Sequence, residues 1–340
     1  MKSQKTTIKD IARELGFSVS TVSRALKNHP DISSETKRLV NELAEKLQYT
    51  PNPIALSLKN RRSYVVGVII PEVVHFFFSS IISGIENIAE RNGYSVMLVQ
   101  SNEQLSREII AINTILQGKV DGVMASVSKE TNNYDHFQKL IDLNIPLVFF
   151  DRIAEGIEAT HVVVDDFGGA YAATDHLAKQ GYKNIAHFAG PQNRQIYRNR
   201  LKGYTKALID NGLEIKEELI IEADNISQAK ITVEKLVTSG VKFDAIFAVN
   251  DFTAAGALLS LKKANFRVPD DVALVGFANE AITQMLEPNL SSVHQSAFEM
   301  GEKAMGYLLQ QINSENRPPP QRIILPTYLI VRESSQRNKS

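Results

Sequence analysis

The sequence of 340 residues contains no cysteine, and no hydrophobic run in it is long enough to span a bilayer. Without cysteine there can be no disulfide framework, and nothing argues for export to an oxidising compartment. The first residues, MKSQKTTIKD, are charged and polar with no apolar segment behind them, so no secretory signal is expected. We therefore predict a cytoplasmic protein with no membrane contact. Its length suits one large two-lobed domain or two to three smaller domains.

The sequence also lacks the short motifs of common enzymes. No GxGxxG follows the first apolar run, and no P-loop, GxSxG or HExxH motif occurs. Six histidines show no metal-ligand spacing and are interpreted as structural: His75, His136, His161, His176, His187 and His294. We expect no catalytic residue, no metal and no cofactor. An enzyme that uses α/β lobes for nucleotide or sugar chemistry stays an alternative, and turnover of a candidate sugar would support it.

Net charge is absent as well, because 38 lysine and arginine residues balance 38 aspartate and glutamate residues. The charges are unevenly distributed. Residues 1–62 hold 12 basic and 6 acidic residues, which leaves 26 basic and 32 acidic residues for the rest of the chain. A compact basic segment on an acidic body is the distribution expected when only that segment contacts phosphates.

The basic segment contains a pattern typical of short helices joined by a tight turn. In TIKDIARELGFSVSTVSRAL, residues 7–26, Thr7 and Asp10 have the spacing of a capping pair, and apolar residues follow at helical intervals. Gly16 suits a left-handed turn, and Ser18 is a good N-cap for a second helix up to about residue 26. A third helix is predicted after the N-cap Ser33, ending near residue 49.

The second helix has an apolar face that packs and an outward face with short side chains and positive charge at its C-terminal end. Such a helix suits entry into a DNA major groove, where Arg24 can reach guanine or phosphate. The outward residues are Val19, Ser20, Ser23, Arg24 and Lys27. On the pattern alone, an ordinary helical hairpin with a polar outer face is the alternative.

Residues 7–26 closely resemble the DNA-binding headpiece of the lac repressor (LacI/GalR) family of transcription regulators, and the resemblance continues through ISSETKRLVNELAEKLQYTPNPIALSLK into the rest of the chain. It implies a hinge that becomes helical on DNA, where a leucine at the position of Leu58 enters the minor groove. Leu56 stands where the family commonly has arginine, which puts one phosphate contact in question. The expected DNA-binding residues are Thr7, Ser18, Val19, Ser20, Thr21, Ser23, Arg24, Lys27, Lys37, Asn52, Leu58 and Lys59.

From residue 64 the pattern changes to short apolar runs that alternate with amphipathic segments. The runs YVVGVII, YSVMLVQ, DGVMA and PLVFF are predicted strands, with helices at 77–92, 103–117 and 134–143. The alternation restarts with HVVV near residue 161 and continues with NIAHFA, ELIIEA, DAIFAV and VALVGF. It predicts two parallel sheets covered by helices, and therefore two α/β lobes with a cleft between them.

The predicted fold is a small all-α helix-turn-helix headpiece followed by a two-lobed α/β domain, which the resemblance relates to periplasmic binding proteins. The predicted boundaries are 1–48 for the headpiece, 49–62 for a hinge or linker, 63–333 for the effector-binding and dimerisation domain, and 334–340 for a disordered tail. The resemblance also implies that the helix at 296–312 and the final strands, RIILP and LIV, cross back between the lobes.

Open parallel sheets bind ligands beyond the carboxyl ends of their strands, so the residues just after each apolar run are candidates for ligand contacts. They include carboxylates, guanidinium groups, amides and aromatic rings, which suit a small polyhydroxylated molecule. Together with the contacts that the resemblance implies, the expected effector-binding residues are Phe77, Phe78, Asp151, Arg194, Tyr197, Arg200, Asn250, Asp251, Asn279 and Gln295.

One position departs from the family pattern. Many members carry an acidic residue after the strand that ends in VGF, whereas this sequence has Ala278, followed by Asn279 and Glu280. Part of the usual hydroxyl clamp is then missing or displaced, and with Arg194 and Arg200 the balance shifts towards positive charge. We expect a carbohydrate effector. Because position 278 carries no acidic residue, a sugar acid or a phosphorylated sugar is more strongly favoured than it would be with an aspartate there.

The leading hypothesis is a ligand-responsive repressor that binds a palindromic operator as a homodimer and is switched by a small molecule, most simply a sugar or sugar derivative. A solute-binding receptor for a carbohydrate, without a DNA role, is the alternative from another class. The basic headpiece and the missing signal peptide both count against that alternative. A shifted band with operator DNA would distinguish the two.

Overall fold

A computed structural model describes residues 6–49, 62–74 and 76–337. The chain divides into two compact units, Met1–Tyr64 and Val65–Ser340, and the helices of the first unit have a hydrophobic core of their own. Several residues singled out from the sequence lie outside the described residues, namely Asn52, Leu56, Leu58, Lys59 and His75.

The first unit contains three helices, α1 (Ile8–Leu15), α2 (Val19–Leu26) and α3 (Ser34–Lys46). The Asp10 carboxylate accepts hydrogen bonds from the N–H and the hydroxyl of Thr7 at 2.9 and 2.6 Å, which confirms the predicted capping pair. Gly16 ends α1 in the left-handed region with φ 68°. The hydroxyls of Ser18 and Ser33 each accept the N–H three residues on, both at 3.1 Å, so both predicted N-caps are confirmed.

Apolar side chains from all three helices close the core of the first unit. Ile11 from α1, Val22 and Ala25 from α2, and Val40 from α3 are all less than 2% exposed. Because this core is small, each helix can bury only one face, and the other faces of α1, α2 and α3 lie in solvent.

The second unit holds two six-stranded sheets. The first consists of β1 (Val65–Ile70), β2 (Ser95–Gln100), β3 (Gly122–Ala125), β4 (Leu147–Phe150), β5 (Thr160–Val164) and β11 (Arg322–Leu325), in the order β11-β5-β4-β3-β1-β2. The second consists of β6 (Ile185–Ala189), β7 (Ile220–Glu222), β8 (Ala245–Ala248), β9 (Ala273–Ala278), β10 (Ser291–Gln295) and β12 (Thr327–Ile330), in the order β12-β10-β9-β8-β6-β7. All pairs are parallel except β10 with β12.

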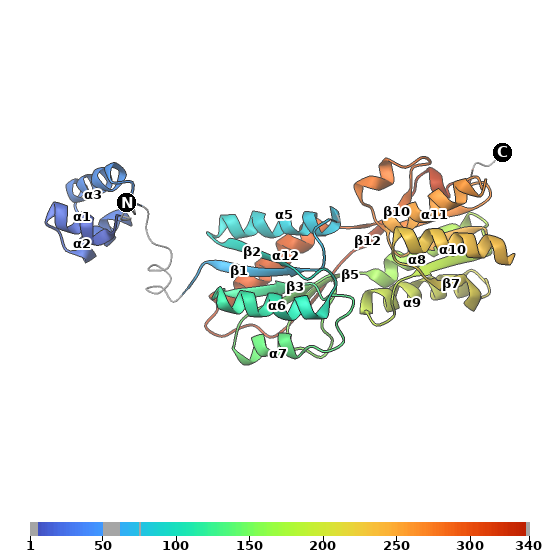
Figure 1. Cartoon of the computed structure of the whole chain (residues 1–340), viewed down its shortest axis with the longest axis horizontal. Helices are drawn as coiled ribbons and strands as arrows, with labels where there is room; N and C mark the ends of the chain where they lie inside the picture. Colours follow the sequence, from blue (N-terminus) through green and yellow to red (C-terminus); the bar gives the residue numbers. More distant parts are fainter. Residues whose placement is uncertain (1–5, 50–61, 75, 338–340) are drawn as a thin grey trace. The chain divides into compact units, whose positions relative to one another are not determined.

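Helices cover both faces of each sheet, as Figure 1 shows. In the first lobe, α5 (Phe76–Arg91) and α12 (Ala297–Asn313) pack on one face, and α6 (Leu105–Gln117) and α7 (Asp135–Asp142) pack on the other. In the second lobe, α10 (Ile226–Ser239) and α11 (Asp251–Lys263) pack on one face, and α8 (Asp166–Lys179) and α9 (Gln195–Asp210) on the other. The two predicted α/β lobes are confirmed.

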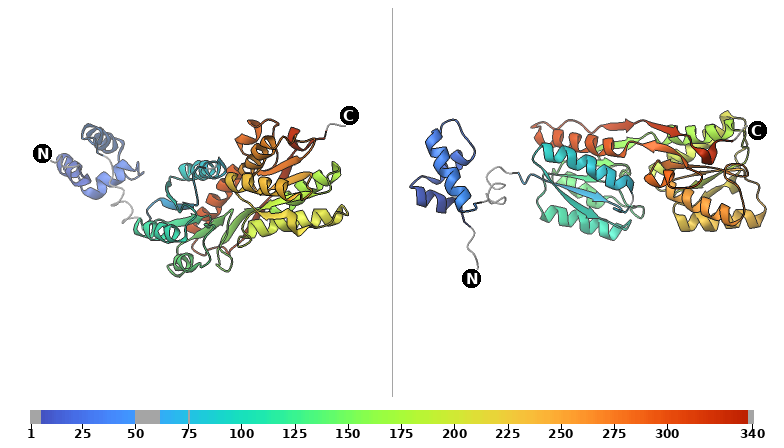
Figure 2. Two further views of the ribbon diagram at one scale, coloured as in Figure 1. Left: turned by 45° about the vertical axis from the view of Figure 1, so that its right-hand side comes forward. Right: turned by 90° about the horizontal axis from the view of Figure 1, so that it is seen from above.

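Within residues 76–337 the chain passes between the lobes three times, from β5 to α8, from β10 to α12 and from β11 to β12 (Figure 2). The first and third crossings lie side by side, because the N–H of Asp165 donates to the carbonyl of Leu325 and the Thr327 hydroxyl donates to the carbonyl of Asp165, both at 2.9 Å. The expected return of the final strands is confirmed.

The disordered tail predicted from residue 334 is wrong at its beginning. Ser334 and Ser335 are completely buried in a short 3-10 helix, Glu333–Ser335. The Ser334 hydroxyl donates to the carbonyl of Leu274 at 2.6 Å and accepts the N–H of Ser291 at 2.8 Å. These small hydroxyls satisfy backbone groups of β9 and β10, a role that polar composition alone does not reveal.

Candidate functional site

Most of the predicted outward face of α2 is solvent-exposed, although Ser23 is half-buried. Val19, Ser20, Arg24 and Lys27 are exposed, and Val19 is 42% exposed although it is apolar. Small side chains at the start of the helix allow its backbone to approach a DNA groove closely. The cations at its end can then contact bases or phosphates. Among residues 6–49, Arg24 makes no ion pair, so its guanidinium stays available for a base or a phosphate.

Other polar residues of the headpiece are engaged within the protein. Thr7 and Ser18 both cap helices, so their side chains stabilise α1 and α2 first. Arg38 pairs with Glu35 at 2.7 Å and with Glu42 at 3.0 Å, whereas its neighbour Lys37 makes no ion pair within residues 6–49. The Arg38 pairs leave Lys37 as the better phosphate contact of the two.

Between the lobes lies a cavity of about 440 Å³. Seven of the ten residues predicted to bind an effector line it: Phe77, Phe78, Asp151, Tyr197, Arg200, Asn250 and Gln295. They come from the N-terminal turn of α5, the ends of β4, β8 and β10, and the first half of α9. A ligand there would contact both lobes at once.

The other three predicted residues do not line this cavity. The Arg194 guanidinium donates to the Tyr134 hydroxyl and to the carbonyl of Lys129, both at 3.1 Å, and so joins the lobes directly. Asp251 accepts the N–H of Glu280 at 2.7 Å and is buried behind the cavity wall. Asn279 accepts a hydrogen bond from Arg332 at 2.6 Å. Protein partners hold all three polar groups, and an effector contact from any of them stays a prediction.

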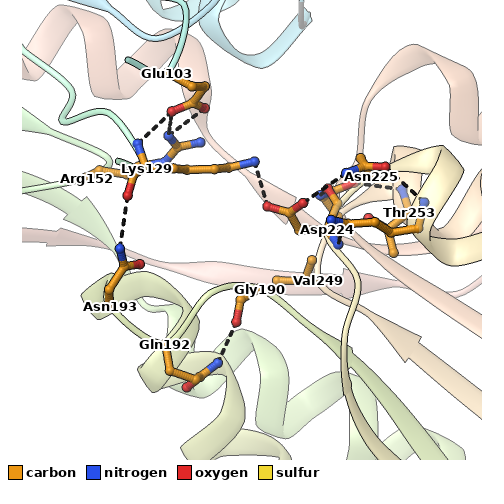
Figure 3. Close-up of polar contacts among 12 residues, drawn as sticks. Glu103, Lys129, Arg152, Gly190, Gln192, Asn193, Asp224, Asn225, Val249 and Thr253 are labelled. Atoms are coloured by element: carbon orange, nitrogen blue, oxygen red, sulfur yellow. Dashed lines mark hydrogen bonds and ion pairs between the residues drawn. The ribbon is translucent and has the colours of Figure 1, made fainter. Parts of the chain in front are cut away.

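Lys129, which sequence reasoning missed, connects the two lobes at the cavity (Figure 3). Its ammonium lies 2.6 Å from the carboxylate of Asp224 in the second lobe. Its carbonyl accepts the Asn193 amide at 3.0 Å, and its own N–H donates to Glu103 at 2.8 Å. The same Glu103 carboxylate accepts Arg152 at 2.8 Å. Lys129 lies beyond the end of the run DGVMA, so strand-end reasoning passed it over, whereas Asp224 directly follows the predicted strand ELIIEA and is accessible to the same reasoning.

A buried carboxylate shapes the loop that carries Lys129. Glu108 of α6 is fully buried and accepts the N–H and hydroxyl of Ser128 at 2.7 and 2.8 Å, the hydroxyl of Thr131 at 2.7 Å and the ring of His136 at 2.8 Å. Burial alone would raise the pKa of Glu108, but these hydrogen bonds hold it below its usual value. His136 is therefore structural, as predicted.

The three cations that line the cavity are each paired with a carboxylate. Lys129 pairs with Asp224, Arg152 pairs with Glu103, and Arg200 pairs with Asp166 at 2.8 Å. The Arg200 guanidinium also donates to the carbonyl of Val249 at 2.6 Å and lies 3.7 Å from the centre of the Phe277 ring. These pairs neutralise the positive charge that a sugar acid or phosphate would need.

Two further carboxylates of the cavity lining, Asp151 and Glu280, have raised pKa values. Burial raises the pKa of Asp151, against the nearby Arg152 and Arg200. Burial and the charge of Asp251 raise the pKa of Glu280 to about 7. The expected shift towards positive charge is therefore wrong, since Glu280 brings a carboxylate to the cavity two residues after Ala278.

A helix-turn-helix headpiece and a two-lobed domain with a polar cavity between the lobes together define a DNA-binding protein that responds to a small molecule. Comparison with known families identifies both parts. Residues 7–52 match the bacterial regulatory proteins of the lacI family, and residues 63–333 match the periplasmic binding proteins and sugar binding domain of the LacI family. The chain belongs to the LacI family and is a DNA-binding transcription regulator, as the resemblance implied.

Individual relatives agree along nearly the whole length. The catabolite control protein A of Priestia megaterium is 32% identical over 311 residues, which cover 91% of this chain and 93% of that protein. The ribose operon repressor of Halalkalibacterium halodurans is 32% identical over 334 residues, which cover 97% of each chain. The structure of the transcriptional regulator CelR with cellobiose covers 97% of this chain and 100% of its own, with 28% identity and a TM-score of 0.74.

The relatives are transcription regulators, and neither the enzyme nor the solute-receptor alternative is favoured. Across the described ranges, the longest helices are too short or too polar to cross a membrane. No group of three or more His, Asp or Glu residues in those ranges is placed to hold a metal ion.

Proposed function

We propose that this protein is a repressor that binds a palindromic operator as a homodimer and is switched by a neutral carbohydrate. The observation that carries the choice of effector is the pairing of all three cavity cations, Lys129, Arg152 and Arg200, with carboxylates. An anionic effector would compete with the carboxylate of one of these pairs, so the ion pair that it gains is offset by the ion pair that it disrupts. A neutral ligand binds without that cost.

The rest of the lining suits a sugar. Asp151 and Glu280 supply acceptors, Asn250 and Gln295 supply amides, and the rings of Phe77, Phe78, Tyr197 and Phe252 supply apolar faces. Hydroxyl groups both donate and accept hydrogen bonds, while the C–H face of a sugar ring packs on aromatic rings. Two relatives support the same class, since one is named for a ribose operon and another was solved with cellobiose.

The proposed division of the chain keeps residues 1–48 as the DNA-binding headpiece, 49–62 as the hinge, and a two-lobed domain that begins at 63. We extend that domain beyond 333, because Ser334 and Ser335 belong to its core. The family membership supports Ser20, Ser23, Arg24, Lys27 and Lys37 as operator contacts. A role in transcription supports a location in the cytoplasm with the DNA, and we propose no catalytic activity for the protein.

A homodimer is supported by the DNA target and by the surface. A helix as short as α2 reads only a few base pairs, so specificity requires two headpieces on two half-sites. The second unit exposes large apolar side chains, including Val74 at 76%, Phe76 at 58% and Met285 at 79%. Exposed apolar side chains of this size suit contact with a second copy of the chain.

The test combines thermal unfolding with DNA binding. Sequences selected from a random pool should be palindromic, and sedimentation should show a dimer on them. D-Ribose, D-glucose or cellobiose should raise the midpoint of thermal unfolding and change operator affinity, because a ligand of the folded state stabilises it by mass action. Stabilisation by gluconate or glucose 6-phosphate, and not by any of the neutral sugars, would overturn the proposed effector class.

A further inference from the structure

The chain makes an unusual bend directly after β9. Ala278 has φ 116° and Asn279 has φ 55°, so two consecutive non-glycine residues occupy the left-handed half of backbone space. Partners hold the bend on both sides. The Asn279 N–H donates to the Ser292 hydroxyl at 3.0 Å, and its side-chain oxygen accepts the Arg332 guanidinium at 2.6 Å.

This bend delivers Glu280 to the cavity. Its N–H donates to the Asp251 carboxylate at 2.7 Å, which fixes the backbone, and the residue is only 8% exposed. Glu280 lines the 440 Å³ cavity and also a neighbouring cavity of about 320 Å³ beside the first turns of α5 and α12. A carboxylate at the wall between two cavities, without a cation as partner in the described ion pairs, has acceptor positions left for a ligand beyond those that backbone N–H groups occupy.

We propose that Glu280 is a specificity-determining residue whose carboxylate accepts hydrogen bonds from hydroxyl groups of the effector. Glu280 is then the carboxylate acceptor of the second lobe, and Asp151 is that of the first lobe. The inference rests on the proposed carbohydrate effector and deepens it. It assigns to Glu280 the hydroxyl contact that Ala278 cannot make, because the methyl side chain of Ala278 has no polar atom. The two carboxylates then lie on different lobes, and the sugar joins them.

The position of Glu280 also connects the ligand to the opposite lobe. The backbone N–H groups of Phe76 and Phe77, in the first turn of α5, donate towards the Glu280 carboxylate. These N–H groups have no partner within the helix, so an acceptor from the other lobe stabilises the helix start. Because α5 and Glu280 belong to different lobes, this contact joins the lobes, as the proposed ligand would.

The test uses D-ribose, D-glucose, D-galactose and cellobiose, with calorimetric titration of the full chain. For whichever sugar binds most tightly, the set of its monodeoxy derivatives is titrated against the parent protein and against Glu280→Gln. We expect Glu280→Gln to weaken the intact sugar at least tenfold. We expect the same substitution to have little effect on the one derivative that lacks the contacted hydroxyl, because that contact is already absent.

Glu299→Gln is the matched control. Glu299 is an exposed carboxylate that lines the neighbouring cavity but not the effector cavity, so sugar affinity should stay within twofold. Thermal unfolding of each variant checks the fold, and Glu280→Asp, which keeps the charge on a shorter side chain, replaces Glu280→Gln if the latter unfolds.

Each outcome decides between the two proposals. Unchanged sugar affinity in Glu280→Gln overturns the proposed role of Glu280. An equal loss of affinity for the sugar and for all its deoxy derivatives also overturns it, because Glu280 would then only support the fold. Failure of all four neutral sugars to bind the parent protein overturns the proposed effector class, and the role of Glu280 with it.

Discussion

Replacing Lys129 with methionine removes one of the cations that link the two lobes. The Lys129 ammonium lies 2.6 Å from Asp224, and the two side chains are 29% and 9% exposed. For charge centres about 4 Å apart, an effective dielectric of about 20 gives an attraction of about 4 kcal/mol. Both groups lose hydration when they pair, and Lys129 is partly exposed, so the net contribution of the ion pair to holding the lobes together is about 2 kcal/mol. The closed form should therefore lose about 30-fold in population relative to the open form.

The absence of cysteine makes this shift directly measurable. Cysteines placed at Gln117, at the end of α6, and at Lys202, in α9, carry spin labels on the two lobes, and both positions are exposed. We expect Lys129→Met to lengthen and broaden the distance distribution between the labels. Lys139→Met, which removes an exposed lysine of the first lobe, should leave it unchanged.

A double-variant cycle with Asp224→Asn isolates the pair. If the ion pair holds the lobes together, the second substitution should add little once Lys129 is gone. Effector affinity should fall by about the same factor as the closed population, because the ligand contacts both lobes. A distance distribution identical to the parent, or fully additive effects of the two substitutions, would refute this role of Lys129.

Three further substitutions test the headpiece, the cavity and the packing. Arg24→Ala should weaken one operator position by about 1 to 3 kcal/mol in anisotropy titrations at fixed salt, and unchanged affinity would contradict a DNA contact. Arg200→Ala leaves the buried Asp166 carboxylate unpaired and should lower the free energy of unfolding in urea by about 3 to 5 kcal/mol, with partial recovery on adding Asp166→Ala. Gly301→Ala places a methyl group against a backbone carbonyl of α5 and should cost about 1 to 3 kcal/mol. Gly306 lies on the same helix with open space around it, so Gly306→Ala should be neutral or slightly stabilising. Equal effects of the two glycine substitutions would refute the close packing of α12 against α5.

The sequence predicts the framework well because apolar runs identify buried strands, and buried parallel strands imply helices on both faces. The same reasoning finds cavity residues that directly follow an apolar run, such as Asp151 after PLVFF and Asn250 after DAIFAV. It also finds the headpiece, since capping residues such as Ser18 and Ser33 act within one helical turn.

Contacts between distant segments are not predictable in this way. Lys129 and Asp224 are 95 positions apart in the sequence and meet only because two lobes face each other. Arg194 follows a strand and carries a charge, as a ligand contact would, but the carbonyl of Lys129 and the hydroxyl of Tyr134 hold it instead. The position of Glu280 at the cavity is not predictable for another reason. The direction of the chain there depends on the positive φ angles of Ala278 and Asn279.

The polar contacts around the cavity fall into two kinds that respond differently to movement of the lobes. Arg152 with Glu103 lies within the first lobe, and Arg200 with Asp166 lies within the second, so neither pair depends on the angle between the lobes. Lys129 with Asp224 joins the lobes, so the distance between its charges depends on that angle. A ligand changes a conformational equilibrium only through contacts that differ between the two states. A sugar held solely within one lobe would bind without switching the protein, so the effector must contact the second lobe as well as the first.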